Sequence, residues 1–531
     1  MSLAGFSPAK LYVFTSSKVR RIAAWFAASA SDRAGGLRLV IWFAVAHAVL
    51  WTAILAKLKA AQDIHFDTAE AYAWGQKFQL GYGKHPPLSG WFAGLWFDLF
   101  PATNLAAYGL AMATVSVGLV ISWLIALRVV DRRRAFFVVV MLALYPIFNF
   151  KGFKYNPDLL QLVTLPLLVL AYLNAFEKRT VRAGLWLGLA AALALMTKYW
   201  VLTMIGAIGI AALLHPQRLA FLRSPAPWVA IAALVVAMAP HLWWLKQVDF
   251  APLTYAGDVY ALKDRAECLQ LVLGYIGHNL ALLAAPVALA ALVLAWRHPL
   301  TPARNWVRGA NAGVSGAQAL NVWITQIVVA IGPPLGALAF MVYLKTDWGI
   351  SLFFLVPLAL VAIPRLRLPK IALVDLTAVW LVITLATLVA APYIEARTVA
   401  DYPDSAAGYS AKSELARELT ETWHQRFGSR WAVVAAPTEV GEPMTFYSPD
   451  HPLTYTPGEV WSSGLTSLEE AKRLGFIGIF DNRDDRLPAF DKWMAANAPN
   501  AEILVMNTQR FFSGHAGPST TWKIYIVPPG K

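Results

Sequence analysis

A polar segment follows the first long apolar run of the chain. Residues 66–91 read FDTAEAYAWGQKFQLGYGKHPPLSGW and combine two acids, Asp67 and Glu70, with Lys84, His85 and a Pro-Pro pair. A loop that only connects two membrane spans has little need for this combination. The segment therefore indicates a polar site at a membrane edge.

The composition indicates a polytopic α-helical membrane protein. Of the 531 residues, 58% are hydrophobic and 14% are charged, and the mean hydropathy is +0.52. A span needs about 20 apolar residues, because backbone polar groups in a bilayer must be paired within a helix. We predict about eleven transmembrane helices, at 37–56, 104–127, 135–150, 158–176, 183–197, 199–214, 227–245, 268–296, 321–344, 350–363 and 371–391.

Basic residues set the predicted orientation in a bacterial inner membrane. The tail over residues 1–36 is typical of a basic cytoplasmic lead-in to an uncleaved first span. The loops that would then be cytoplasmic are rich in arginine, and the odd number of spans places the C-terminus in the periplasm. The basic residues concerned are Lys10, Lys18, Arg20, Arg21, Arg33 and Arg38 near the start, and Arg128, Arg132, Arg133, Arg134, Lys178, Arg179, Arg182, Arg218, Arg223, Arg297, Arg304, Arg308, Arg365, Arg367 and Lys370 in the loops.

Residues 392–531 form a second predicted unit, a small extracytoplasmic α/β domain. It follows a membrane unit over 37–391, whose first outer loop is 57–103. The second unit holds 17 acidic and 13 basic residues, so the net charge of +14 comes from the membrane unit. The single cysteine of the chain, Cys268, excludes an internal disulfide. Predicted strands lie at 430–437, 475–482, 501–507 and 520–529, and predicted helices at 467–475, with a Ser467-x-x-Glu470 capping box, and 486–497.

Several common functional motifs are absent from the sequence. There is no Walker sequence, GxGxxG loop, CxxC pair or GxSxG elbow, and no internal repeat of 20–50 residues. ATP-driven transport, dinucleotide chemistry and serine hydrolysis lose support. We expect no nucleotide cofactor and no nucleic-acid partner.

Basic residues also remain in the outer loops, against the topological bias. Collected around a cavity at membrane level, they suit an anionic group such as the phosphate of a lipid carrier. Alternatively, each lysine only snorkels from a helix end to the interface. These residues are Lys84, His85, Lys151, Lys154, Lys198, Lys246 and Lys345.

The two acids of the opening segment also allow two interpretations. Asp67 and Glu70 are three residues apart, so on a short helix they share a face and look into one cavity. Alternatively, Asp67 is a helix N-cap and Glu70 its capping-box partner. The aromatic residues nearby, Tyr82 among them, need only form an interfacial belt.

The opening segment resembles the first periplasmic loop of the GT-C glycosyltransferases that use polyprenyl-phosphate sugars. This family contains the protein O-mannosyltransferases and the lipid A aminoarabinose and galacturonic acid transferases. KYNPDLLQLVTLPLLVLAYL (154–173) and LMTKYWVL (195–202) extend the resemblance over roughly the first 250 residues. Two departures stand out: the acids are separated where many members have adjacent Asp-Glu, and Lys84-His85 replaces Asp-His or Glu-Lys.

The resemblance implies a GT-C fold and a sugar transfer that needs a base and cations. A base takes the proton of the acceptor, and cations stabilise the departing phosphate. The candidate catalytic acids are Asp67, as the base, and Glu70, and the candidate phosphate ligands are Lys84, His85, Lys154 and Lys198. Candidates for the sugar or acceptor are Tyr82, Asn156, Asp158, Tyr199, His241, Lys345 and Asp347.

Alternative roles exist for some of these candidates. Asn156 and Asp158 flank Pro157, a pattern that is also typical of helix capping. His241 follows Pro240 at the end of a span, where a hydrogen-bonded interface histidine is the simpler account. Lysines could replace the metal that nucleotide-sugar enzymes use, although Asp67, Glu70 and His85 could also hold a divalent ion.

The sequence therefore favours an inverting glycosyltransferase that moves a sugar from a polyprenyl-phosphate donor to lipid A or a similar glycolipid at the periplasmic face. The abundance of lysine favours an acidic sugar such as galacturonic acid. Alternatives are a protein O-glycosyltransferase of the same fold and a transporter or flippase for anionic polyprenyl lipids. The sequence assigns no further role to residues 392–531 beyond covering the site or recruiting the acceptor.

Overall fold

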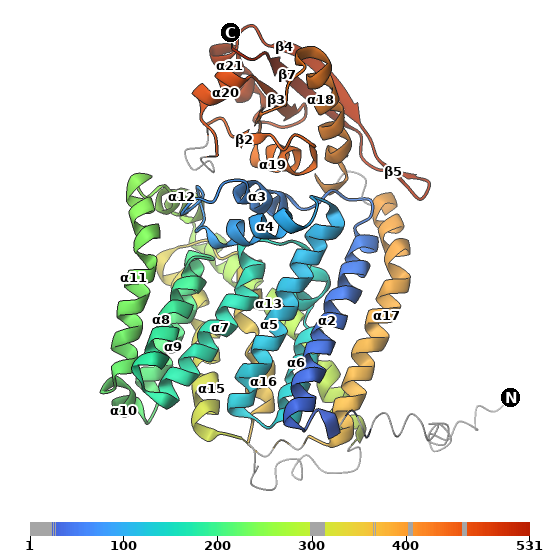
Figure 1. The fold of residues 1–531 in the computed structure, drawn as a ribbon. Helices are drawn as coiled ribbons and strands as arrows, with labels where there is room; N and C mark the ends of the chain where they lie inside the picture. The colour runs from blue at the N-terminus through green and yellow to red at the C-terminus, as the bar shows by residue number, and fades with distance from the viewer. Residues whose placement is uncertain are drawn as a thin grey trace, which may run out of the picture.

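The chain forms a bundle of helices with an α/β domain at one end, as the computed structural model shows (Figure 1). The structure describes residues 24, 26, 28–297, 314–364, 366, 368–401, 407–458 and 465–530. Most of the predicted basic tail lies outside the described residues. The basic residues concerned there and in the loops are Lys10, Lys18, Arg20, Arg21, Arg304, Arg308, Arg365 and Arg367.

Seven helices of the described part are long and apolar enough to cross a membrane, and the other predicted spans are shorter or broken. The seven are α2 (Arg33–Leu58), α5 (Asn104–Val129), α7 (Pro157–Lys178), α11 (Pro225–Gln247), α13 (Arg265–Arg297), α15 (Gly316–Phe340) and α17 (Lys370–Asp401). The others are α6 (Arg132–Ala143), α8 (Val181–Leu195), α9 (Leu202–Leu214) and α16 (Val356–Val361). Each of the eleven predicted segments contains helix.

The break after α6 has a local cause. Pro146 has no amide hydrogen for the helical ladder and disfavours helical geometry in the residue before it, so it favours a break of the helix here. The chain instead makes two 3₁₀ turns, η2 (Pro146–Phe148) and η3 (Phe150–Phe153), bent by 82° from α6. The predicted span 350–363 is likewise a 3₁₀ helix, η5 (Thr346–Phe353), followed by the short α16.

Helices α8 and α11 pack at van der Waals contact through small residues. A side chain at Gly184 would meet the carbonyl oxygen of Ala226 at 2.3 Å, and one at Gly188 would meet that of Ala230 at the same distance. Small residues let helix backbones approach closely where lipid offers no hydrophobic driving force between helices. The close packing of α8 against α11 therefore depends on the absence of side chains at these two glycines.

A layer of short helices separates the bundle from the α/β domain (Figure 1). It contains α3 (Phe66–Gly75), α4 (Leu88–Leu99) and α12 (Ala251–Tyr260). Residues 68–75 of α3 are all buried, because the helix lies between the bundle and the domain above it. The short helix α10 (Arg218–Leu222), at the bottom of the bundle in Figure 1, and the 3₁₀ turn η4 (Tyr199–Val201), before α9, complete the membrane part.

The α/β domain is built on a five-stranded sheet of order β2-β1-β3-β7-β4. Strand β1 runs parallel to β2 and β3, and β7 runs antiparallel to β3 and β4. Trp423, Trp431 and Trp522 are fully buried in its core. The strands are β1 (Val433–Ala435), β2 (Leu453–Tyr455), β3 (Phe476–Asp481), β4 (Glu502–Thr508) and β7 (Thr520–Val527), with a separate hairpin of β5 (Phe511–Phe512) and β6 (His515–Ala516).

The predicted elements of this domain are all present. The four predicted strands are β1, β3, β4 and β7, and the two predicted helices are α20 (Leu468–Leu474) and α21 (Leu487–Asn497). The Ser467 side chain accepts the Glu470 amide at 3.1 Å, as the capping box predicted. The sequence did not indicate α18 (Lys412–Phe427), α19 (Thr438–Tyr447) or β2. Helix α17 continues through Pro392 to Asp401, so the domain starts later than the predicted boundary at 392.

Candidate active site

A polar cavity of about 350 Å³ lies at the end of the bundle that faces the α/β domain. Its walls come from α3, the loop after α3, the start of α7, the residue before η4, α12 and the loop between α15 and η5. Eight of the predicted site residues line it: Asp67, Glu70, Lys84, His85, Asn156, Asp158, Lys198 and Lys345. Segments that are far apart in sequence thus meet in one cavity.

Asp67 lies in the first turn of α3 and points toward the head of α7. The N-cap of α3 is His65, whose Nδ1 accepts the Asp67 amide at 3.2 Å, so the capping-box alternative for Asp67 is wrong. Asp67 Oδ2 accepts a hydrogen bond from Asn156 Nδ2 at 2.9 Å and lies 3.5 Å from Lys154 Nζ. Asn156 also caps α7, because its Oδ1 accepts the Leu159 amide at 2.9 Å.

The surroundings of Asp67 favour its ionised form. Burial alone would raise the pKa of Asp67, but His65 when it is protonated, the charge of Lys154 and the Asn156 amide outweigh burial and hold the pKa well below its usual range. Burial and the nearby lysines lower the pKa of His65 to about 4. At neutral pH His65 is therefore uncharged, and Lys154 and Asn156 stabilise the carboxylate.

A second ion pair joins the other acid of α3 to the following loop. Lys84 Nζ lies 2.7 Å from Glu70 Oε1, and the Glu70 side chain is only 8% exposed. Burial opposes the charged form of Lys84, but the Glu70 carboxylate raises the pKa of Lys84 above its usual range. Burial, with Lys198 and Lys84 nearby, lowers the pKa of His85 well below its usual value. His85 is therefore a neutral hydrogen-bonding group.

A third ion pair joins the first turn of α7 to the residue before η4. Lys198 Nζ donates to both Asp158 oxygens, at 2.7 and 2.8 Å, and sits 5.0 Å above the Trp348 ring. Lys345 is exposed at the cavity and has no ion-pair partner in the described ranges. Four lysines, three of them paired with carboxylates, thus surround the cavity, and an anionic ligand can draw donors from these pairs.

Five predicted residues do not line this cavity, and one of them, Lys154, reaches it only through its ion pair with Asp67. Tyr82 is buried and stacks on Trp74 at 5.3 Å between ring centroids. Tyr199 bonds to His241 Nε2 at 3.0 Å, and His241 Nδ1 bonds to the Leu80 carbonyl at 2.7 Å, so this pair ties α11 to the first outer loop. The fifth, Asp347, has its Oδ1 atom 3.5 Å from Lys151 Nζ and 3.4 Å from His278 Nε2.

Three tyrosines in the cavity wall were not foreseen. Tyr255 and Tyr260 on α12 join through their hydroxyls at 3.1 Å, and the Tyr343 amide donates to the Tyr260 carbonyl at 2.8 Å. The Tyr260 ring meets the Trp348 ring edge-on at 4.9 Å. The only sequence signal was aromatic residues beside apolar runs, which also mark an interfacial belt.

An apolar groove of about 380 Å³ opens beside the polar cavity, between α9 and α15. Tyr343 lines both. Gly206, Gly332 and Gly336 leave the groove open, because a Cβ atom at any of them would have no neighbour within 4 Å. A polar site and an apolar groove therefore adjoin each other.

Comparisons with known proteins agree with this arrangement. The family model described as dolichyl-phosphate-mannose-protein mannosyltransferase matches residues 84–244. Lipid A galacturonosyltransferase RgtD of Rhizobium johnstonii is 29% identical over 239 residues, which is 42% of this chain and 46% of the relative. The match thus spans about half the length of that relative.

Two crystal structures of ArnT from Cupriavidus metallidurans share the architecture. The apo structure has a TM-score of 0.60 at 13% identity and covers 94% of this chain and 99% of that chain. The structure bound to undecaprenyl phosphate has a TM-score of 0.58 at 12% identity and covers 94% and 100%. The chain has the GT-C fold. The predicted fold class is therefore confirmed, and so is the resemblance to the glycosyltransferase family of protein mannosyltransferases and lipid A transferases.

Within this GT-C fold the cavity holds no ready-made metal site. Among the residues that the structure describes, no three His, Cys, Asp or Glu side chains lie close enough together to hold a metal ion. Asp67, Glu70 and His85 therefore do not form the divalent-ion site that the sequence left open. Asp67 and Glu70 face lysines instead.

Proposed function

We propose that the protein is an inverting glycosyltransferase that moves a sugar from a polyprenyl-phosphate donor to lipid A or a similar lipopolysaccharide acceptor. The observation that carries this proposal is one cavity at whose wall Asp67 pairs with Lys154, Glu70 with Lys84, and Asp158 with Lys198. The same cavity thus offers a base for an acceptor hydroxyl and cations for a lipid phosphate.

The reaction is a single displacement at the anomeric carbon. The Asp67 carboxylate takes the proton of the acceptor hydroxyl as its oxygen forms a bond to that carbon. The bond from the carbon to the phosphate oxygen breaks, and the polyprenyl phosphate leaves with the electron pair. Lys84, Lys154 and Lys198 stabilise the charge that gathers on the phosphate. One attack from the face opposite the leaving group inverts the configuration.

The low pKa of Asp67 makes it a weak base when the donor is absent. Lys154 and Asn156 are the neighbours that hold it so at neutral pH. A donor phosphate competes for the Lys154 ammonium, and its negative charge opposes the ionised carboxylate. Donor binding therefore raises the basicity of Asp67 when the proton must move.

The apolar groove between α9 and α15 suits the lipid tail of the donor. It adjoins the polar cavity at Tyr343, so a phosphate among the lysines can continue into a chain among Gly332, Gly336 and Phe340. We place the site on the periplasmic side of a bacterial inner membrane, with α2 entering from the cytoplasm. The surplus lysine, Lys345, favours a donor sugar or acceptor with its own negative charge.

The test is transfer of labelled sugar by the purified protein. Donors are a panel of polyprenyl-phosphate sugars that includes galacturonic acid and aminoarabinose, and acceptors are lipid A and a serine-rich peptide. We expect transfer to lipid A, and loss of kcat by 10²- to 10⁴-fold in Asp67→Asn. Asp98→Asn is the matched control, because Asp98 is exposed on α4 and does not line the cavity.

Other outcomes point elsewhere. Transfer to the peptide alone supports a protein O-glycosyltransferase, in keeping with the description of the matching family. Binding of polyprenyl phosphates by wild type without any transfer rules out the enzyme and supports the flippase. An active Asp67→Asn variant removes Asp67 as the base.

A further inference from the structure

The segment between α2 and α3, residues 61–64, is held by distant parts of the chain. The Ala61 amide donates to Glu395 on α17 at 3.2 Å, and the Gln62 carbonyl accepts Asn104 Nδ2 of α5 at 3.2 Å. The other two contacts are made by residues that follow α17 in the sequence. The Asp63 amide donates to the Gly408 carbonyl at 2.7 Å, and the Ile64 amide donates to Tyr447 Oη of α19 at 2.7 Å.

Asp63 provides the missing cap of a helix in the α/β domain. Helix α18 starts after Ala411, which has a left-handed φ of 58° and no capping side chain. The Asp63 carboxylate accepts the amides of Lys412 at 2.9 Å and Ser413 at 3.3 Å. A carboxylate at a helix N-terminus satisfies free amides and the helix dipole. The first outer loop therefore completes a helix of the domain.

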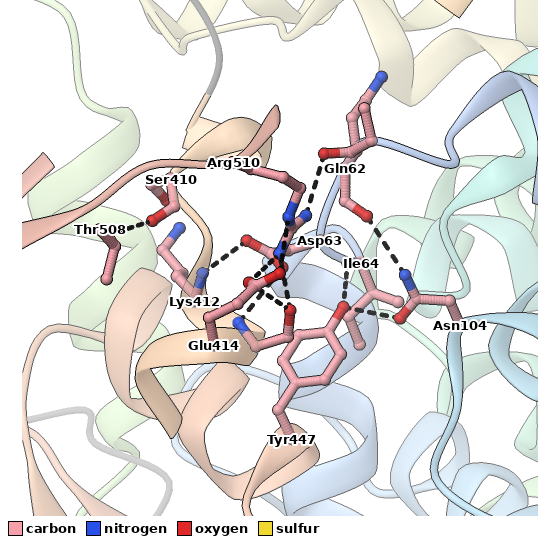
Figure 2. A network of polar contacts seen from close by, with 12 residues as sticks. Gln62, Asp63, Ile64, Asn104, Ser410, Lys412, Glu414, Tyr447, Thr508 and Arg510 are labelled. Carbon is pink, nitrogen blue, oxygen red and sulfur yellow. Dashed lines mark hydrogen bonds and ion pairs between the residues drawn. The ribbon is translucent and has the colours of Figure 1, made fainter. Parts of the chain in front are cut away.

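Arg510 closes the same contact from the other side (Figure 2). Its Nη2 lies 2.7 Å from Asp63 Oδ1, its Nη1 donates to the Ala61 carbonyl at 2.9 Å, and it also pairs with Glu414 on α18. The Asp63 side chain is 2% exposed and that of Arg510 is 14% exposed. A buried, hydrogen-bonded ion pair of this kind is costly to break on one side.

The domain also covers the outer face of α3. Phe446 of α19 meets the Tyr72 ring edge-on at 5.2 Å, and Tyr72 Oη lies 3.0 Å from His451 Nδ1. At the end of the helix, Lys77 Nζ donates to the Leu465 carbonyl at 2.6 Å. Both ends of the segment that contains Asp67 are thus fixed by the α/β domain.

We propose that the α/β domain positions the candidate catalytic carboxylate, with Asp63 and Arg510 as positioning residues. Asp63 lies four residues before Asp67, and His65 between them caps α3. Any shift of residues 61–64 is transmitted to the start of α3, and displacement of a reacting group by about 1 Å can reduce a rate 10²-fold. The inference rests on the proposed function only for the role of Asp67.

The test compares Arg510→Gln with Arg426→Gln. Arg426 pairs with Glu502 inside the α/β domain and does not contact the first outer loop, so it is a matched control for loss of an ion pair. We expect Arg510→Gln to lower kcat by 10- to 100-fold with KM for the donor within about threefold of wild type. Hydrogen exchange of the α3 amides should rise, and that of α7 should not. In the control Arg426→Gln, kcat, KM for the donor and the exchange of the α3 amides should equal those of wild type.

Two further variants test whether the effect comes from the ion pair itself and not from misfolding. Asp63→Asn keeps an oxygen that can cap α18 but loses the negative charge. The double variant with Arg510→Gln should have a kcat no lower than that of the slower single variant, because both changes break the same ion pair. Arg510→Lys should restore part of the kcat if Arg510→Gln expresses poorly. Wild-type kcat and α3 exchange in Arg510→Gln overturn the proposal. An inactive wild type overturns the proposed function instead, while the exchange measurement still decides this one.

Discussion

Asn156 shows how a single side chain can satisfy two interpretations at once. The sequence left open whether it caps a helix or binds a ligand. In the structure its Oδ1 accepts a hydrogen bond from the Leu159 amide and so caps α7, and its Nδ2 donates a hydrogen bond to Asp67. The cap orients the amide, so the folding role fixes the geometry of the candidate site.

A variant that keeps the cap but adds charge isolates the second role. Asn156→Asp still caps α7, because Asp and Asn are equally good N-caps. Its carboxylate faces Asp67 and raises the pKa of Asp67, so Asp67 becomes protonated at higher pH. We expect the acid limb of the kcat/KM profile to move up by roughly one pH unit.

The control for this measurement is Asn156→Ser, which caps the helix without a charge. Its acid limb should move less than that of Asn156→Asp. An acid limb in the same place for wild type and Asn156→Asp would show that Asp67 is not the titrating base.

At the scale of single residues, the sequence predicted the groups that carry charge but not all of their neighbours. Asp67, Lys84 and Lys198 stood out because charged residues are rare beside apolar runs, and all three line the cavity. Tyr255 and Arg510 gave no such signal. Each acts through contacts that are distant in sequence, and periodicity does not report these.

At the scale of elements, a helix could be predicted where its N-terminal capping residues lie in the local sequence. The capping box of α20 is local, so its helix could be predicted. Helix α18 begins after Ala411 because Asp63 caps it from another part of the chain, and nothing local marks its start. Helix α19 contains Gly441 and Pro443, both poor helix formers, and is held by packing against α3.

The glycine-lined groove of α15 leads to a prediction at this scale. Gly336→Leu fills open space rather than clashing, and Leu is the better helix former, so the protein should remain folded. If the groove holds the donor tail, KM for long-chain donors rises about tenfold and kcat changes less than twofold. Donors with short tails should be unaffected.

Gly277→Leu is the matched control for this substitution. Gly277 lies on α13, also has no neighbour within 4 Å, and does not line the groove. Its kinetics should equal those of wild type. An equal rise of KM in both variants, or none in Gly336→Leu, would place the donor tail elsewhere.

At the scale of the whole molecule, charge distribution agrees with the arrangement in Figure 1. The acidic α/β domain lies at the opposite end of the bundle from α10. From the positive-inside rule we expect the end with α10 to face the cytoplasm. Hydropathy alone could predict the membrane class, but it could not show that α3 would be enclosed between bundle and domain.

Cysteine labelling tests this orientation. The native Cys268 is buried and should stay silent, so single introduced cysteines report alone. Ala496→Cys on α21 and Ala220→Cys on α10 are both exposed positions at opposite ends. An impermeant maleimide should reach Ala496→Cys from the periplasm and Ala220→Cys only after lysis. The reverse pattern would invert the proposed topology.

The ion pair between Asp63 and Arg510 joins residues that are 447 positions apart. A ribosome releases Asp63 and the helices of the bundle long before it makes Arg510. The membrane part can therefore insert while α3 still lacks its outer support. On the proposed topology and function, the site is completed only at the end of translocation, and partly synthesised chains would not transfer sugar.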